Sequence, residues 1–80
     1  MDETKIYTTD EFEKALIAAT IKEVAIILEE RGYDAKNQIV GYLMSGDPGY
    51  ISSYKGARKK LTSIDRSRIL EFLIRKSLGE

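Results

Sequence analysis

The chain has no cysteine and no histidine, and these two absences exclude several kinds of functional site. Without a thiol it has no disulfide, no cysteine nucleophile and no thiolate ligand for a metal. Without an imidazole it has no Ser-His or Cys-His catalytic pair, and almost every type of zinc site is excluded as well. The composition therefore predicts a protein without enzymatic activity, bound metal or cofactor.

The sequence also has no long hydrophobic run. None of its apolar segments approaches the roughly 20 residues that span a bilayer, and the first fourteen residues are too acidic and polar for a signal peptide. We expect a cytoplasmic protein without membrane insertion. Its 80 residues allow one domain with a small core, which a second copy of the chain would help to stabilise.

Net charge is zero overall, but the two signs are separated along the chain. Residues 1–34 carry nine acidic and four basic side chains, a net charge of −5, whereas residues 55–76 carry eight basic and two acidic ones, a net charge of +6. This separation predicts an acidic partner for the C-terminal half. The partner could be the chain's own N-terminal half, another protein, or a phosphate.

Helical periodicity predicts an all-α fold of about four helices joined by short turns. We expect residues 1–9 to be a flexible tail and residues 10–80 to be one helical domain. The first helix has two possible capping boxes, Thr8 with Glu11 or Asp10 with Glu13, and Gly32 is a natural residue to end it.

That first helix is apolar on more than one face, which is unusual for so small a protein. One set of apolar residues keeps helical spacing and a second set lies beside it: Phe12, Leu16, Ala19, Val24, Ile27 and Leu28, then Ala15, Ile17, Ala18, Ile21, Ala25 and Ile26. Such a helix should be buried on two sides, and a partner subunit would supply the second. The sequence thus predicts a homodimer.

The segment "NQIVGYLMSGDPGYI" combines turn-forming residues with apolar residues at helical spacing. A phosphate-binding loop would need a lysine after its glycines and a strand before them, and neither is found here. A structural corner is favoured instead. Asp34 caps a second helix, Gly46 ends it, and Asp47 followed by Pro48 starts the next turn. Gly41, in the middle of this helix, predicts close approach of another helix.

Two more helices follow the corner. Ala57 and Leu61 belong to a short third helix, and Thr62 or Ser63 is expected to cap the last one, which Gly79 ends.

The basic segment Lys55–Lys76 has three interpretations. It could bind nucleic acid as part of a helix-turn-helix-like unit, it could bind an acidic or phosphorylated protein segment, or it could be a solvated helix surface. Zero net charge argues against nucleic acid, which we keep as an alternative. In the acidic tail, Thr4 is accessible to a kinase, while Thr8 and Thr9 adjoin the start of the first helix.

The run "GYDAKNQIVGYLMSGDPGYI", with "AR" at 57–58 and "DET" at 2–4, closely resembles the IreB/ReoM family of small regulatory phosphoproteins from Gram-positive bacteria. The resemblance covers nearly the whole chain. It implies a small, all-helical, cytoplasmic homodimer without enzymatic activity, which is a substrate of a membrane Ser/Thr kinase with PASTA repeats. It also implies control of peptidoglycan synthesis and cell-wall antibiotic tolerance, through Clp-protease degradation of the first committed peptidoglycan enzyme.

The resemblance assigns roles to three residues. Thr4 matches the phosphorylated threonine of the family, and phosphorylation would relieve the regulatory action. Arg58 and Arg66 match arginines of a basic surface that would bind a protein partner. The family has further arginines where this sequence has Ser53 and Thr62, so that surface is less basic here.

Overall fold

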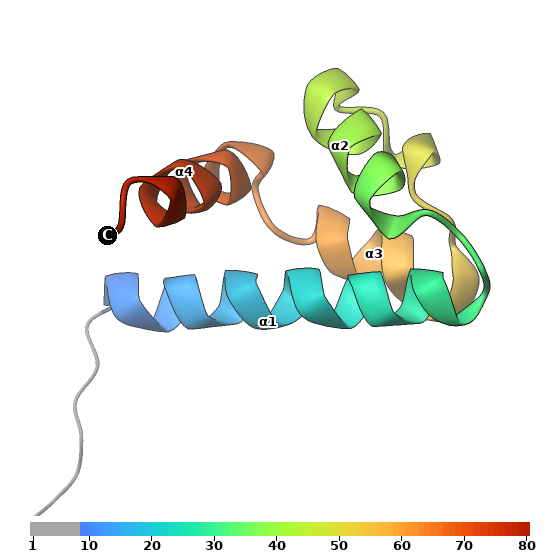
Figure 1. The fold of residues 1–80 in the computed structure, drawn as a ribbon, viewed down its shortest axis with the longest axis horizontal. Coiled ribbons are helices and arrows are strands. Elements are labelled where there is room, and N and C mark those ends of the chain that lie inside the picture. The colour runs from blue at the N-terminus through green and yellow to red at the C-terminus, as the bar shows by residue number, and fades with distance from the viewer. Residues whose placement is uncertain (1–8) are drawn as a thin grey trace, which may run out of the picture.

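A computed structural model describes residues 9–80 as an all-helical unit (Figure 1). Four α-helices and two short 3₁₀ turns follow one another, and these residues include no strand. The elements are α1 (Thr9–Glu30), α2 (Ala35–Ser45), η1 (Pro48–Tyr50), η2 (Tyr54–Gly56), α3 (Ala57–Thr62) and α4 (Arg66–Ser77). The predicted all-α fold of about four helices is confirmed, while the predicted tail lies mostly outside the described residues.

Helix α1 is the base on which the other helices are arranged (Figure 1). Its 22 residues form a helix about 33 Å long at 1.5 Å per residue. Helices α2 and α3 lie over its C-terminal half, and α4 lies beside its N-terminal half. Helix α4 runs antiparallel to α1, so the end of the chain returns to the place where α1 begins.

The two ends of α1 test the predicted caps. The helix begins at Thr9, so Asp10 is already inside its first turn, and the capping box of Asp10 with Glu13 is wrong. The other box depends on Thr8, which lies outside the described residues. At the other end, Gly32 has a φ of 85° and its N–H donates to the carbonyl of Glu29. Gly32 therefore ends α1 as predicted.

The corner after α2 forms as the sequence predicts. Asp34 accepts a hydrogen bond from the backbone N–H of Asn37 at 3.1 Å, and Gly46 ends the helix with a φ of 78°. Asp47 then accepts from the N–H of Gly49 at 2.8 Å, with Pro48 in the first position of η1. Because the Asp47 carboxylate occupies this turn's N–H, the segment is a structural corner.

The close neighbour of Gly41 proves to be a single aromatic ring. A Cβ atom at Gly41 would lie 2.5 Å from Cδ1 of Tyr50, which belongs to η1. The expected close approach thus comes from the corner that follows α2, where the ring needs the space that a side chain would fill.

The start of α4 differs from the prediction. Asp65 is the N-cap, because its carboxylate accepts a hydrogen bond from the N–H of Ser67 at 3.2 Å. The hydroxyls of Thr62 and Ser63 instead donate to carbonyls of the preceding turn, those of Arg58 and Lys60. Neither residue caps α4, because each hydroxyl is bound within α3 or its last turn.

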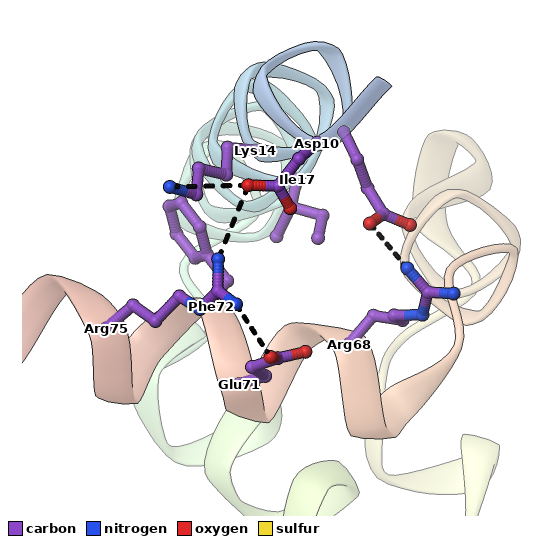
Figure 2. Close-up of a pocket in the computed structure, with 8 residues that line it drawn as sticks. Asp10, Lys14, Ile17, Arg68, Glu71, Phe72 and Arg75 are labelled. Atoms are coloured by element: carbon purple, nitrogen blue, oxygen red, sulfur yellow. Dashed lines mark hydrogen bonds and ion pairs between the residues drawn. The ribbon is translucent and has the colours of Figure 1, made fainter. Parts of the chain in front are cut away.

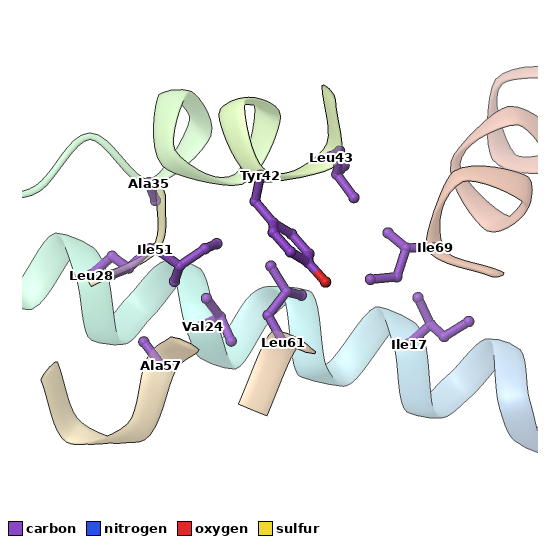
Figure 3. Packing of buried hydrophobic residues seen from close by; sticks show 10 residues of the cluster. All are labelled: Ile17, Val24, Leu28, Ala35, Tyr42, Leu43, Ile51, Ala57, Leu61 and Ile69. Atoms are coloured by element: carbon purple, nitrogen blue, oxygen red, sulfur yellow. The ribbon is translucent and has the colours of Figure 1, made fainter. Parts of the chain in front are cut away.

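The buried core lies mainly over the C-terminal half of α1 (Figure 3). Helix α4 contributes Ile69 to it, whereas α2, α3 and the segment between them contribute more. The buried residues are Ile17, Val24, Leu28, Ala35, Tyr42, Leu43, Ile51, Ala57, Leu61 and Ile69.

Several large apolar side chains remain exposed outside this core. On α1 they are Phe12, Leu16 and Ile26, and on α4 and its C-terminal end they are Leu70, Leu73, Ile74 and Leu78. Phe12 and Ile26 are each 67% exposed, so α1 has a second apolar face that the core does not cover. Among the described helices, none is both long and apolar enough to cross a membrane.

Candidate functional site

Two of the three predicted site residues, Arg58 and Arg66, lie at the corner that follows α2. The third, Thr4, is outside the described residues. The Nε–H of Arg58 donates to the carbonyl of Ile51 at 2.8 Å, and Nη1 of Arg66 donates to the carbonyl of Leu43 at 2.9 Å. The two arginines thus bind the carbonyls that flank the corner on either side.

Arg66 also packs closely against the backbone of that corner. A Cβ atom at Gly46 would lie 2.9 Å from Cζ of Arg66, so the guanidinium occupies space that any other residue at position 46 would need. Both arginines are half-buried. Each guanidinium has five N–H donors, and the bond to the carbonyl uses one of them. These side chains therefore have a structural role at the corner.

Acidic side chains of α1 form ion pairs with basic side chains of the C-terminal half. Within the described part of the chain, four ion pairs join α1 to the basic C-terminal half: Lys55–Glu30 at 3.0 Å, Lys60–Glu23 at 3.3 Å, Arg68–Glu13 at 2.6 Å and Arg75–Asp10 at 3.4 Å. Of the three acidic partners considered for this half, the structure identifies the chain's own N-terminal half for these four side chains. Together with the bonds of Arg58 and Arg66, these pairs leave the nucleic-acid alternative without support.

At one end of the molecule the ion pairs gather into a network between α1 and α4 (Figure 2). We call it the ionic cluster, and its members are Asp10, Glu13, Lys14, Arg68, Glu71 and Arg75. Arg75 lies 3.4 Å from a carboxylate oxygen of Asp10 and 3.1 Å from one of Glu71, and Glu80 is 4.0 Å away. Asp10 also pairs with Lys14 at 3.6 Å. A cavity of about 20 Å³ remains between these side chains, roughly the space of one water molecule.

A different cluster surrounds Tyr54 near the other end of α1. The guanidinium of Arg31 lies 4.9 Å from the centre of the Tyr54 ring, and the ammonium of Lys55 lies 5.5 Å from it. The hydrogen bond and charge of Glu30 raise the pKa of Lys55. Lys55 is also the non-glycine residue with a positive φ, 48°, in the described chain.

An apolar cavity of about 220 Å³, open to solvent on one side, lies between α1 and α4 beyond the ionic cluster. Its lining combines apolar side chains with two lysines: Ala18, Ile21, Lys22, Phe72, Leu73 and Lys76. The Nζ atom of Lys76 lies 6.0 Å from the centre of the Phe72 ring. Helix α4 is thus incompletely packed on α1 at this point.

The described residues contain no group of three or more acidic side chains placed to hold a metal ion. Sequence reasoning did not find the ionic cluster or the apolar cavity. The charge separation indicated which halves attract each other, but the pairing of residues 10 and 75 depends on the path of the chain through the corner and α3.

A family model described as IreB regulatory phosphoprotein matches residues 2–79 of the chain. The match spans nearly all of the 80 residues. The chain therefore belongs to the family of IreB regulatory phosphoproteins, as the resemblance of its sequence indicated.

Proposed function

We propose that this IreB-family protein is a non-enzymatic cytoplasmic regulator that a PASTA-type Ser/Thr kinase phosphorylates on Thr4. The unmodified protein controls peptidoglycan synthesis and cell-wall antibiotic tolerance by promoting Clp-protease degradation of the first committed peptidoglycan enzyme. The match to a family of regulatory phosphoproteins carries this proposal, because it includes the acidic segment around Thr4.

The partner surface in this proposal is the corner that Arg58 and Arg66 hold. Their guanidiniums are fixed by the carbonyls of Ile51 and Leu43, so little side-chain entropy is left to lose on binding. Fixed guanidiniums suit the bidentate recognition of carboxylates. An acidic segment of a protein partner fits this surface best.

The homodimer belongs to the same proposal. No element of residues 9–80 covers the exposed face of α1, with Phe12, Leu16 and Ile26. Large apolar side chains exposed on one side of a helix mark an interaction site or a liability to aggregation. A second copy, packed on this face, would complete the burial of α1. Light scattering at micromolar concentration should return twice the chain mass, and a stable monomer would contradict the dimer.

Mass spectrometry of the protein isolated from its own cells tests the modification. We expect phosphate on Thr4, and its loss when the kinase is deleted. Thr8 and Thr9 serve as internal references in the same spectra. Cells that carry Thr4→Ala, Thr4→Glu or the wild-type protein should then differ in antibiotic tolerance. Equal tolerance in all three, with the kinase active, would show that Thr4 is not the switch.

The partner surface needs a matched control, because Arg58 also stabilises the corner. Arg58→Ala should abolish partner binding, whereas Lys59→Ala, which removes the same charge from the exposed neighbouring residue, should leave it intact. Thermal unfolding of both variants shows whether either has lost its fold. Loss of binding in a folded Arg58→Ala variant supports the surface, and equal binding of both variants refutes it.

A further inference from the structure

We propose that the ionic cluster is the intramolecular acceptor of the Thr4 phosphate, with Arg75 and Arg68 as its ligands. This inference rests on the proposed phosphorylation of Thr4 and adds the site that reads it. Neither the family match nor the sequence assigns a role to these two arginines.

The length of the tail places the phosphate within reach of the cluster. Thr4 precedes Thr9, the first residue of α1, by five positions, which span at most about 18 Å of extended chain. The next residue of α1, Asp10, already lies 3.4 Å from Arg75. By contrast, Arg66 precedes Arg75 by nine positions on α4, about 13.5 Å farther along that helix. Of these two arginines, Arg75 is therefore the nearer to the start of α1, and Arg68, seven positions before Arg75, comes next after it through its pair with Glu13.

Arg75 is loosely held by its present partners, whereas Arg68 is held closely by Glu13 at 2.6 Å. The oxygens around Arg75 lie at 3.1, 3.4 and 4.0 Å, longer than the roughly 2.7–2.9 Å of a good charge-assisted hydrogen bond. The three carboxylates that share it belong to Asp10, Glu71 and Glu80, and each is more than half exposed. Carboxylates this exposed can return to water at small cost, because exposed ion pairs contribute little.

The phosphate must displace carboxylates, since the described side chains of the ionic cluster leave no vacant site for it. Three cations face four carboxylates when Glu80 is included, and the cavity among them holds about 20 Å³. A phosphothreonine carries a charge of about −1.5 to −2 and three acceptor oxygens, whereas each carboxylate carries one charge and two oxygens. It can bind one guanidinium with two oxygens and still offer a third to its neighbour. The exchange therefore favours the phosphate over Asp10 and Glu13.

The exchange would alter the contact between α1 and α4 and leave the corner untouched. When Asp10 and Glu13 are displaced, α4 is tied to the tail instead of to the first turns of α1. Arg58 and Arg66 keep their bonds to backbone carbonyls, which lie on other elements. This differs from a mechanism in which the phosphate covers those two arginines directly.

The pKa of the phosphate itself measures the contact. The full-length protein, phosphorylated on Thr4 and verified by mass spectrometry, is titrated by ³¹P NMR beside a phosphorylated peptide of residues 1–8. In the peptide the second pKa should be near its ordinary value of about 6. In the folded protein, contact with two guanidiniums should lower it by about one unit. Arg75→Gln should remove most of this shift.

Lys76→Gln is the matched control, since it removes one charge from the next residue of the same helix. It should leave the phosphate pKa unchanged. If Arg75→Gln does not fold, the Nε–H signal of Arg75 in the wild-type protein decides, because it should move on phosphorylation. An unshifted phosphate pKa, an equal effect of the two variants, or an Arg75 signal that does not move overturns the inference. Each of these results requires protein that is already phosphorylated on Thr4, so it leaves the proposed function standing. Absence of phosphate from Thr4 in the cell would refute the proposed function instead.

Discussion

The two halves of α1 are held by different forces. Its C-terminal half packs against α2, α3 and the segment between them, where Leu28, Ile51 and Leu61 are completely buried. Its N-terminal half faces α4, where Ile17 and Ile69 are the buried pair, the half-buried Phe72 packs against them, and the ionic cluster provides polar contacts. We call the first region the core half and the second the clasp half.

This difference indicates where the molecule can change. Burial of large apolar side chains contributes roughly 1.5–3 kcal/mol for each one, whereas exposed ion pairs contribute at most about 1 kcal/mol. The clasp half also includes the apolar cavity of about 220 Å³, where α1 and α4 leave apolar surface open to solvent. Helix α4 should therefore open more readily than α2 or α3. Thr4, the proposed phosphorylation site, precedes this less stable half in the sequence.

The largest effect should come from a truncation in the core half. Leu61 is fully buried between α1 and α2, and Leu61→Ala should lower the free energy of unfolding by about 2–5 kcal/mol. In a domain this small, that is most of the stability. Urea unfolding measures the loss. Leu73→Ala is the matched truncation in the clasp half, where the side chain is 37% exposed. Equal losses in the two variants would contradict the comparison.

A glycine at the joint between the two halves should have the next largest effect. Gly46 has a φ of 78°, and a Cβ there would also displace the Arg66 guanidinium, which ties α4 to the end of α2. Gly46→Ala should cost about 1–2 kcal/mol for the backbone conformation. Loss of the Arg66 hydrogen bond should add about 1 kcal/mol.

Gly32→Ala separates these two contributions. Gly32 has a similar φ of 85°, but a Cβ atom there would meet nothing within 4 Å. Gly32→Ala should therefore lower the free energy of unfolding only by the cost of the backbone conformation, about 1–2 kcal/mol. If thermal unfolding gave the same loss for both glycines, the contact of Arg66 with the corner would not stabilise the joint.

The core half was largely predictable from the sequence, because its signals are local. Asp34, Gly46 and Asp47 have side chains or conformations that act within a few residues, and each occupies the predicted position. The predicted N-cap of α4, Thr62 or Ser63, was wrong because Thr62, Ser63 and Asp65 are all residue types that cap helices and lie close together. Only the path of the chain shows that the first two bond back into α3.

The clasp half was not predictable, since its contacts join residues far apart in the sequence. Asp10 and Arg75 are separated by 65 positions, and no local pattern pairs them. The periodicity of α1 showed two apolar faces but did not distinguish the buried face, with Ile17 and Val24, from the exposed one, with Phe12 and Leu16. The roles of Thr4, Arg58 and Arg66 came from resemblance, and they stay predictions.

Within the clasp, the ion pair of Arg68 with Glu13 should contribute a small and salt-sensitive amount. The two side chains are 54% and 35% exposed and their atoms are 2.6 Å apart. A double-mutant cycle with Arg68→Gln and Glu13→Gln should give a coupling energy of about 0.2–1 kcal/mol that falls as salt is added. In the Arg68→Gln and Glu13→Gln variants, amide hydrogen exchange should be faster than in the wild type in α4 and unchanged in α3. A coupling that resists salt would mean that the clasp is more than a surface contact.

The smallest effect should come from Lys55, whose ion pair belongs to the core half. The hydrogen bond from its ammonium to Glu30, at 3.0 Å, and the charge of that carboxylate raise the pKa of Lys55 above its ordinary value of 10.5. A raised pKa means that the folded state holds the proton more tightly than the unfolded state. The contribution of this ion pair to stability is therefore complete below pH 10.5 and is lost as the pH rises through the folded-state pKa.

NMR titration of the Lys55 side chain should show a lower pKa in Glu30→Gln than in the wild type. An identical pKa in both proteins would show that the pair of Lys55 with Glu30 does not form in solution. Ion pairs on α1 would then contribute in the clasp half and not at this position of the core half.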